Sequence, residues 1–147
     1  NLNESLFNKL NKLNYYTLPN PKSLGREWFE CEFLPQIDEK KLSNNDILST
    51  LTHHIAYQIS CVVNNKENQS ILVTGGGAKN AFLMELCHYY APNLNWILLE
   101  ENIIDYKEAL IFAFLGLLRM ERKENCLSSV TGAVKNVIGG AVYYNIY

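Results

Sequence analysis

The chain has 147 residues, a formal net charge of -2 and a pI of about 5.9. This length suits one domain with a substantial core, and 48% hydrophobic with 19% charged residues is typical of a folded globular protein. Basic residues do not outnumber acidic ones and form no polybasic run. Nucleic acid and a membrane surface are therefore not expected as partners.

Two short helices are predicted in the first 34 residues. Leucines at helical spacing predict an amphipathic helix over residues 2–14. A second short helix is predicted from Ser23 to Leu34, because Pro35 ends it. Further on, Ser43 with Asp46 three residues later forms an acidic variant of the capping box.

A long helix is expected over residues 44–64 after this cap, followed by a loop. Its apolar side chains recur along one stripe: Ile47, Leu51, Ile55, Ile59 and Val62 or Val63. Residues 71–73 then form a short apolar run bounded by turn residues, which indicates a fully buried parallel strand.

Three glycines follow this strand, and a helix is predicted over residues 78–90 with its inward side chains at Phe82, Leu83, Leu86 and Cys87 or Tyr90. A second strand is predicted at 95–99, and a helix over 105–122 that is apolar on most sides and therefore buried. The tail contains a β-prone run at 141–144.

Strands that alternate with helices predict an α/β fold with parallel pairing, a short sheet flanked by helices. Two strands do not make a free-standing sheet, so the tail, an unrecognised strand or sequence outside the chain must complete it. The chain begins with Asn1 on a predicted helix and not with Met, so we expect it to be part of a longer protein.

The most informative segment is the turn Gly75-Gly76-Gly77, with Lys79 and Asn80 after it. Glycines between a strand and a helix let a ligand approach the backbone, and the N–H groups of the helix start suit phosphate. The segment matches neither a Walker A loop nor GxGxxG, so a P-loop or dinucleotide site is disfavoured. The alternative is a tight turn without a ligand.

Two further candidates are weaker on their own. Lys22 and Arg26, if helical, share a face beside Glu27 and could frame a nucleotide; the alternative is a solvated helix end with one local ion pair. Glu108 is expected in the first turn of its helix, with Asp105 as the cap. Glu108 could accept hydrogen bonds from a sugar hydroxyl, or be an ordinary first-turn acid.

No catalytic or metal-binding pattern accompanies these segments. The four cysteines show no CxxC spacing, and the three histidines complete no zinc site. His53, His54 and His88 are expected in the core or on the surface, since no nucleophile motif accompanies them. Isolated cysteines fit a reducing cytoplasm, and the longest apolar stretch, 109–118, is too short to cross a bilayer.

Four segments together resemble the C-terminal half of the anhydro-N-acetylmuramic acid kinases, in that family's order and approximate spacing. They are Pro21-Lys-Ser-Leu-Gly-Arg-Glu-Trp-Phe29, Leu72-Val-Thr-Gly-Gly-Gly-Ala-Lys-Asn80, Lys107-Glu-Ala-Leu-Ile-Phe-Ala-Phe-Leu115 and Asn125-Cys-Leu-Ser-Ser-Val-Thr-Gly-Ala133. The resemblance covers residues 15 to 143 and implies one ribonuclease-H-like lobe of the actin-like, sugar-kinase superfamily over residues 1–147. It also implies cytoplasmic cell-wall recycling in bacteria, with ATP and Mg²⁺ as cofactors and a possible homodimer.

The resemblance also implies roles for single residues. Gly75, Gly76, Gly77 and Asn80 match the adenosine-side motif, and Lys22, Arg26 and Glu27 match the PKSxGRE segment, whose spacing is similar to a helix beside the adenosine in actin. Glu108 matches a glutamate of the sugar pocket. The implied reaction converts 1,6-anhydro-N-acetylmuramic acid, ATP and water to N-acetylmuramic acid 6-phosphate and ADP, with water opening the anhydro bridge.

The family's MSGTSxDG-type phosphate loop and aspartate base are absent from this sequence. The resemblance therefore makes the chain a C-terminal lobe that requires the N-terminal lobe for catalysis and has no catalytic residue of its own. Two alternatives stay open: another sugar kinase of the superfamily, and a non-catalytic actin-like binding module.

Overall fold

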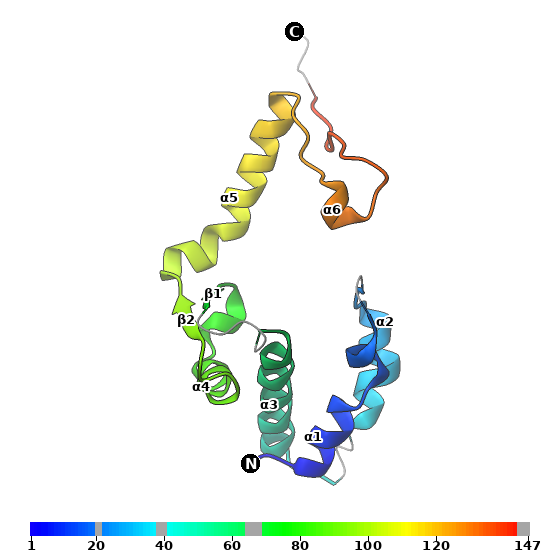
Figure 1. Cartoon of the computed structure of the whole chain (residues 1–147), viewed down its shortest axis with the longest axis vertical. Coiled ribbons are helices and arrows are strands. Elements are labelled where there is room, and N and C mark those ends of the chain that lie inside the picture. The colour runs from blue at the N-terminus through cyan, green and yellow to red at the C-terminus, as the bar shows by residue number, and fades with distance from the viewer. Residues whose placement is uncertain (20–21, 38–40, 64–68, 144–147) are drawn as a thin grey trace. The chain divides into compact units, whose positions relative to one another are not determined.

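The computed structural model describes residues 1–19, 22–37, 41–63 and 69–143. It divides into two compact units, Asn1–Leu98 and Leu99–Tyr147 (Figure 1). Each unit is described by itself. The expectation of a single lobe over residues 1–147 stays a prediction.

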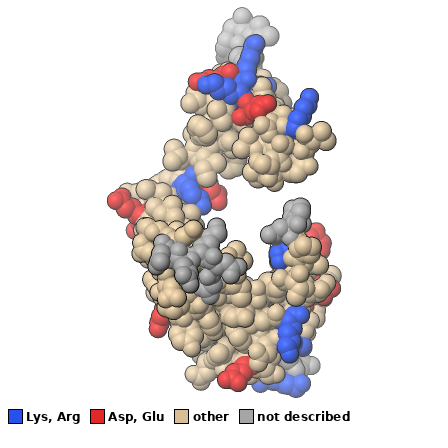
Figure 2. Space-filling model, in the orientation of Figure 1, with Lys and Arg blue, Asp and Glu red and all other residues tan. Residues whose placement is uncertain are grey.

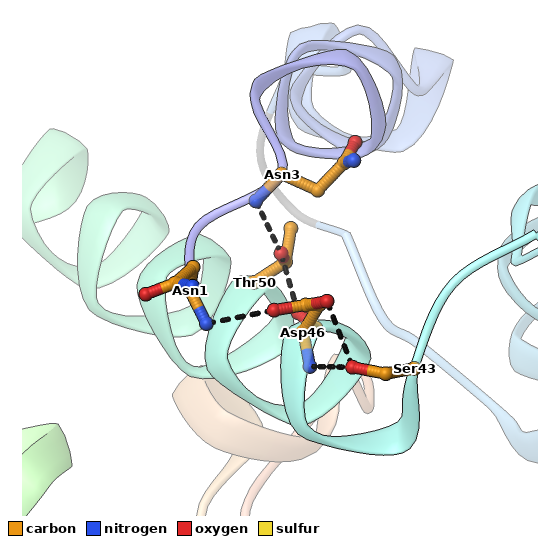
Figure 3. Close-up of polar contacts among 5 residues, drawn as sticks. All are labelled: Asn1, Asn3, Ser43, Asp46 and Thr50. Carbon is orange, nitrogen blue, oxygen red and sulfur yellow. Dashed lines mark hydrogen bonds and ion pairs between the residues drawn. The ribbon is translucent and has the colours of Figure 1, made fainter.

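Helix α1 (Glu4–Asn11) is held against helix α3 (Asn44–Val63) by polar contacts near their N-termini. The Asn3 N–H donates to Thr50 Oγ1 at 2.8 Å, and Thr50 Oγ1 donates to the Asp46 carbonyl at 2.7 Å (Figure 3). The predicted capping box is confirmed, because Asp46 N–H donates to Ser43 Oγ at 3.2 Å. Helix α1 is shorter than the predicted 2–14, since the Asn3 side chain caps it by accepting from Leu6 N–H.

The segment between these helices is less regular than predicted. A 3-10 turn (η1, Asn14–Thr17) precedes α2 (Arg26–Trp28), which passes into a π-helical turn (η2, Phe29–Phe33) and a final 3-10 turn (η3, Leu34–Gln36). The predicted start at Ser23 is wrong, because Gly25 is extended and α2 begins only at Arg26. Leu6, Leu10 and Phe33 form the small core of this region.

The apolar stripe of α3 is only partly covered. Ile47 is buried, together with Thr50, His54, Ala56 and Ser60. Towards its C-terminal end, Ile55, Ile59 and Val62 are exposed, Val62 at 75%. A helix that exposes apolar side chains over two turns carries a surface suited to a partner.

The sheet consists of two parallel strands, β1 (Ser70–Val73) and β2 (Asn95–Leu98), with Ile71 opposite Trp96. Strand type, position and parallel pairing are as predicted. The prediction of full burial is wrong, because Leu72 is 59% exposed. Ile71 and Val73 pack on the core formed with α3 and α4, whereas the opposite face of β1 has no such cover in the described chain.

Helix α4 (Ala81–Tyr90) packs on α3 and closes this core. Leu86 and Cys87 point inward as predicted, but Phe82 is exposed and Met84 takes the buried position. The helix does not begin at residue 78, because a 3-10 turn (η4, Gly76–Lys79) intervenes.

The second unit contains α5 (Glu101–Met120) and a short helix, α6 (Ser128–Thr131). The predicted burial of the helix over 105–122 is wrong, since no residue of α5 is buried. The tail strand is wrong for residues 141–143, which form no strand; residue 144 lies outside the described chain. An antiparallel bridge joins Cys126 and Val137 instead.

The described elements therefore form an α/β structure with a short parallel sheet flanked by helices. Among the described helices, none combines the length and apolar character that a membrane span requires.

Candidate functional site

The glycine turn leaves its backbone open. Gly75 has φ +89° and ψ 173°, a conformation that essentially only glycine adopts. A Cβ added at Gly75 or Gly76 would meet no heavy atom within 4 Å. Packing within the described chain therefore gives no steric reason for glycine at position 76, and the space beside this backbone is available to a ligand.

Thr74, between β1 and this turn, was not singled out from the sequence. Its Oγ1 is buried and has no hydrogen-bond partner in the described chain. Thr74, Gly77 and Ala78 border a largely apolar hollow of about 290 Å³ between β1, α3 and α4. A threonine directly before a glycine triplet is the only sequence signal that could have indicated it.

Asn80 has a structural task in this conformation. Its Oδ1 accepts a hydrogen bond from the Leu83 N–H at 3.1 Å and caps α4. The cap orients the first turn of α4 relative to the glycine turn, because Asn80 N–H also donates to the Gly77 carbonyl at 3.1 Å. Asn80 therefore holds the shape of the turn through its backbone and its side chain.

Lys22 does not share a helix face with Arg26, because α2 begins after it. Its Nζ donates to the carbonyls of Tyr15 and Tyr16, at 3.1 and 3.4 Å, and lies 4.9 Å from the Tyr15 ring centroid. The ammonium group thus holds the 3-10 turn η1 by charge-assisted hydrogen bonds and a cation–π contact.

Arg26 and Glu27 lie on the exposed start of α2. Arg26 Nε pairs with Glu30 Oε1 at 2.6 Å, and its side chain is 86% exposed. The Glu27 carboxylate occupies the space that a Cβ at Gly25 would need, with Oε2 at 2.5 Å from that position. The local ion pair that the sequence left as the alternative interpretation is present.

A partly buried polar network anchors α1 and the 3-10 turn η1 to α3. Asn11 Oδ1 accepts from Gln58 Nε2 at 2.8 Å and from His54 Nδ1 at 2.6 Å, which assigns the ring proton to Nδ1. His54 Nε2 then accepts from the Tyr16 hydroxyl at 2.8 Å. Burial raises the pKa of Tyr16 and lowers the pKa of His54 to about 4, so both groups are neutral near pH 7.

The structure does not bring the two predicted nucleotide-binding segments together. In the described chain, no hydrogen bond joins Lys22, Arg26 or Glu27 to the glycine turn. An apolar groove of about 610 Å³ lies between α3 and residues 16–33, and it shares only Ile59 with the hollow beside the glycine turn.

Glu108 lies in the second unit, exposed, and in the third turn of α5. The prediction that it sits in the first turn is wrong, because α5 begins at Glu101, and Asp105 is not the cap. The argument from the helix dipole therefore does not apply to Glu108. The resemblance to a glutamate of the sugar pocket is therefore the only argument left for a functional role of Glu108.

The described residues contain no group of three or more His, Cys, Asp or Glu side chains that could hold a metal ion. His53 contacts the Tyr90 hydroxyl at 2.9 Å through Nδ1. His53 and His54 are thus both engaged in contacts within the fold.

A family model described as anhydro-N-acetylmuramic acid kinase matches residues 1–145. The chain belongs to this family. A relative named anhydro-N-acetylmuramic acid kinase from Sulfurovum sp. (strain NBC37-1) is 37% identical over 132 residues, covering 88% of this chain and 36% of the relative. A second, from Hahella chejuensis, is 34% identical over 146 residues, covering 97% of this chain and 40% of the relative.

A third relative of the same name, from Aliivibrio fischeri, is 32% identical over 151 residues, covering 95% of this chain and 40% of its own length. The chain thus spans about two fifths of the length of these relatives. As a member of the anhydro-N-acetylmuramic acid kinase family, it carries the glycine turn, α2 and α5 within the matched region.

Proposed function

We propose that the chain is the C-terminal, nucleotide-binding lobe of a kinase that phosphorylates 1,6-anhydro-N-acetylmuramic acid with ATP and opens the anhydro bridge with water. The lobe has the ribonuclease-H-like architecture of the actin-like superfamily. The observation that carries this proposal is the glycine turn, whose backbone is uncovered at Gly76, where an added Cβ would meet no heavy atom within 4 Å.

Family membership and the geometry of the turn support the proposal from independent sides. The family model implies that ATP is used. The glycine turn lies at the carboxyl end of a parallel strand, where ligands bind in α/β sheets, and its glycines have no side chains to block a ligand from the backbone. Gly75, Gly76 and Gly77 contact the adenosine side of ATP, and Asn80 orients them. Lys22, Arg26 and Glu27, which share no hydrogen bond with the glycine turn in the described chain, are proposed to contact the nucleotide from another side.

Chemistry in this proposal is phosphoryl transfer by positioning and electrostatic stabilisation. Glu108 accepts hydrogen bonds from the sugar. In this proposal the ligands of Mg²⁺ are the phosphates of ATP and carboxylates of the N-terminal lobe. The base that activates water comes from that lobe as well.

The test is a coupled ADP assay on the full-length protein with 1,6-anhydro-N-acetylmuramic acid as acceptor and a panel of other sugars beside it. Release of ADP that depends on the anhydro sugar supports the proposal. Turnover of a different sugar alone would assign another kinase of the superfamily, and no sugar-dependent ADP release would overturn the proposal.

The site assignment is tested separately with Gly76→Val. Because a Cβ at Gly76 meets nothing in the chain, this variant should keep its thermal stability and lose nucleotide affinity at least about tenfold. Glu85→Ala, on the exposed side of α4, is the control and should bind nucleotide normally. Unchanged affinity in Gly76→Val would show that ATP does not approach this backbone.

A further inference from the structure

Helix α2 carries two charged residues that are proposed to contact nucleotide, Arg26 and Glu27, on a very short stretch of helix. It has three residues and passes into the five-residue turn η2. Helices this short are not stable on their own in water, so packing must hold them in place. Trp28, the last residue of α2, is half-buried, whereas Arg26 and Glu27 are exposed. The contacts of Trp28 therefore decide where the two charged side chains lie.

Trp28 lies in a cluster of aromatic rings, the Trp28 cluster, which it forms with Tyr15, Tyr16 and Phe33. Its ring centroid lies 5.2 Å from that of Tyr15, and 5.9 Å from that of Phe33. The Tyr16 centroid lies 6.1 Å from Trp28 and 5.2 Å from the His54 ring of α3. Phe33 also contacts His54, at 5.6 Å. These separations are those of favourable aromatic pairs, so the cluster attaches α2 to α3 through His54.

Hydrogen bonds fix the orientation of the Trp28 cluster, which apolar packing alone would leave less defined, because only hydrogen bonds are strongly directional. The Tyr16 hydroxyl donates to His54 Nε2 at 2.8 Å, and His54 Nδ1 donates to Asn11 Oδ1 at 2.6 Å. With both ring nitrogens engaged, the imidazole has one orientation, and the Tyr16 ring follows it. Lys22 Nζ donates to the Tyr16 carbonyl at 3.4 Å and ties the segment before α2 to the same residue.

The placement of each cation matters because the charges of this region are not concentrated. On the visible face of the first unit, charged side chains are scattered singly or in small groups (Figure 2). Such a face offers no broad positive surface that would attract a polyphosphate regardless of detail. Arg26 is 86% exposed and pairs with Glu30 on its own helical stretch. What Arg26 contributes to a bound nucleotide therefore depends on how firmly α2 is held.

We propose that Tyr16 and His54 are positioning residues for the nucleotide: their hydrogen bond fixes the Trp28 cluster, and the cluster places Arg26 and Glu27. This inference rests on the proposed function. Neither Tyr16 nor His54 contacts the nucleotide, because the hydroxyl and Nε2 are used by each other. Their effect is on the affinity for ATP and not on the sugar or on the transfer step.

A purely structural role for this hydrogen bond makes a different kinetic prediction. Its loss would then only reduce the fraction of folded enzyme, which lowers the apparent kcat and leaves each KM unchanged. A displaced α2 instead weakens the binding of ATP in an enzyme that is otherwise intact. It raises the KM for ATP and leaves kcat and the KM for the sugar unchanged. The separation of KM from kcat therefore distinguishes positioning from stability.

The experiment compares Tyr16→Phe with Tyr15→Phe by steady-state kinetics of the full-length kinase. Both variants keep the aromatic ring, but in the described chain only the Tyr16 hydroxyl makes a hydrogen bond. Tyr16→Phe should raise the KM for ATP at least about threefold, with kcat and the KM for the sugar within about twofold of wild type. Tyr15→Phe should retain wild-type values. An unchanged KM for ATP in Tyr16→Phe, or an equal rise in Tyr15→Phe, would overturn the proposal.

The other partner of the hydrogen bond is tested by rescue at His54. A glutamine amide oxygen can reach the position of Nε2 and accept from the Tyr16 hydroxyl, whereas a leucine of similar volume cannot accept a hydrogen bond. His54→Leu should raise the KM for ATP at least about threefold, and His54→Gln should recover most of this change. Equal KM values for ATP in the two variants would overturn the role of the hydrogen bond.

Hydrogen exchange of the full-length enzyme without nucleotide tests the attachment of α2 by itself. Peptides that cover residues 22–33 should exchange at least about threefold faster in Tyr16→Phe than in wild type, and peptides of α4 should not change. Wild-type exchange in residues 22–33 would overturn the proposal. The two levels of inference fail differently. A wild-type enzyme without sugar-dependent ADP release would overturn the proposed function, whereas normal turnover with a wild-type KM for ATP in Tyr16→Phe would overturn the positioning role alone.

Discussion

The two segments predicted to bind nucleotide differ in how much of their chemistry the fold already uses. Around Lys22 and Arg26, the cations are engaged: Lys22 with the carbonyls of the turn at Tyr15, Arg26 with Glu30. Around Gly76, the backbone is uncovered and no side chain approaches it. A ligand at the glycine turn displaces no internal contact, whereas one at Lys22 and Arg26 competes with existing contacts.

This difference ranks the candidates. From the sequence, the glycine turn was already the stronger candidate, and charge at Lys22, Arg26 and Glu27 was the weaker one. The structure shows that Lys22 stabilises η1, which the His54 network ties to α3. Both cations of the second segment thus already take part in contacts within the fold, although the segment itself is exposed.

The largest effect is expected from acid, which protonates His54 in the hydrogen-bond network that ties α1 and η1 to α3. The folded pKa of His54 is lowered to about 4 by burial, while the unfolded value is 6.5. A lowered folded pKa means that the unfolded state binds more protons below pH 6.5. The free energy of unfolding should therefore be constant above about pH 6.5 and fall by about 3 kcal/mol as pH decreases to about 4.

Urea unfolding across this pH range measures the slope, and His54→Gln isolates its source. This variant should lose most of the slope between pH 6.5 and 4, while His88→Gln, at an exposed histidine of α4, should retain it. Tyr16, Asn11 and Gln58, which contact His54, do not titrate in this range. Burial also lowers the pKa of the neighbouring His53, which accounts for the slope that His54→Gln retains. A wild-type slope in His54→Gln would show that another group controls acid stability.

The next largest effect is on stability, and it should differ between the neighbouring glycines Gly75 and Gly76 of the glycine turn. Gly75→Ala should lower the free energy of unfolding by about 2 kcal/mol, because φ +89° with ψ 173° strains any residue with a Cβ. Gly76→Ala should change it by less than about 0.5 kcal/mol, since its φ is not positive and its Cβ has open space. Equal losses, measured by urea unfolding, would mean that packing requires glycine at position 76 and leaves no room for a ligand.

Local patterns in the sequence predicted the elements of the first unit well. The capping box at Ser43, the strands and their parallel pairing, and α4 follow from rules that involve a few neighbouring residues. The open glycine turn also follows from such a rule. These rules did not predict the positive φ of Gly75 or the capping role of Asn80, which are seen only in the structure.

Burial was predicted less well, because it depends on what lies beyond the element. Leu72 and α5 have the apolar composition of buried elements, yet the described chain does not cover them. The start of α5 was misplaced because Glu101 and Asn102 carry no apolar periodicity, and this error gave Glu108 a false first-turn position. The His54 network joins residues far apart in sequence, and the Lys22 contacts cross an irregular turn, so local helix and strand patterns reveal neither.

A smaller effect concerns the residue that orients the glycine turn. Asn80→Ala removes the acceptor for Leu83 N–H and should lower the free energy of unfolding by about 1 kcal/mol. Asn80→Ser, which can still cap, should recover most of this loss. If Asn80 contacted nucleotide only and the cap were unimportant, the Ala and Ser variants would have equal stability and differ only in nucleotide affinity.

The smallest effect is expected at Arg26. Its ion pair with Glu30 spans one turn in water, so Arg26→Ala should lower the free energy of unfolding by no more than about 0.5 kcal/mol. Glu30→Ala should have the same small effect on stability, because each variant removes the same pair. Their effects on the KM for ATP should differ, since Glu30→Ala frees the guanidinium and Arg26→Ala removes it. Equal KM values in the full-length enzyme would restrict Arg26 to the local pair and leave the glycine turn as the segment of this chain that contacts nucleotide.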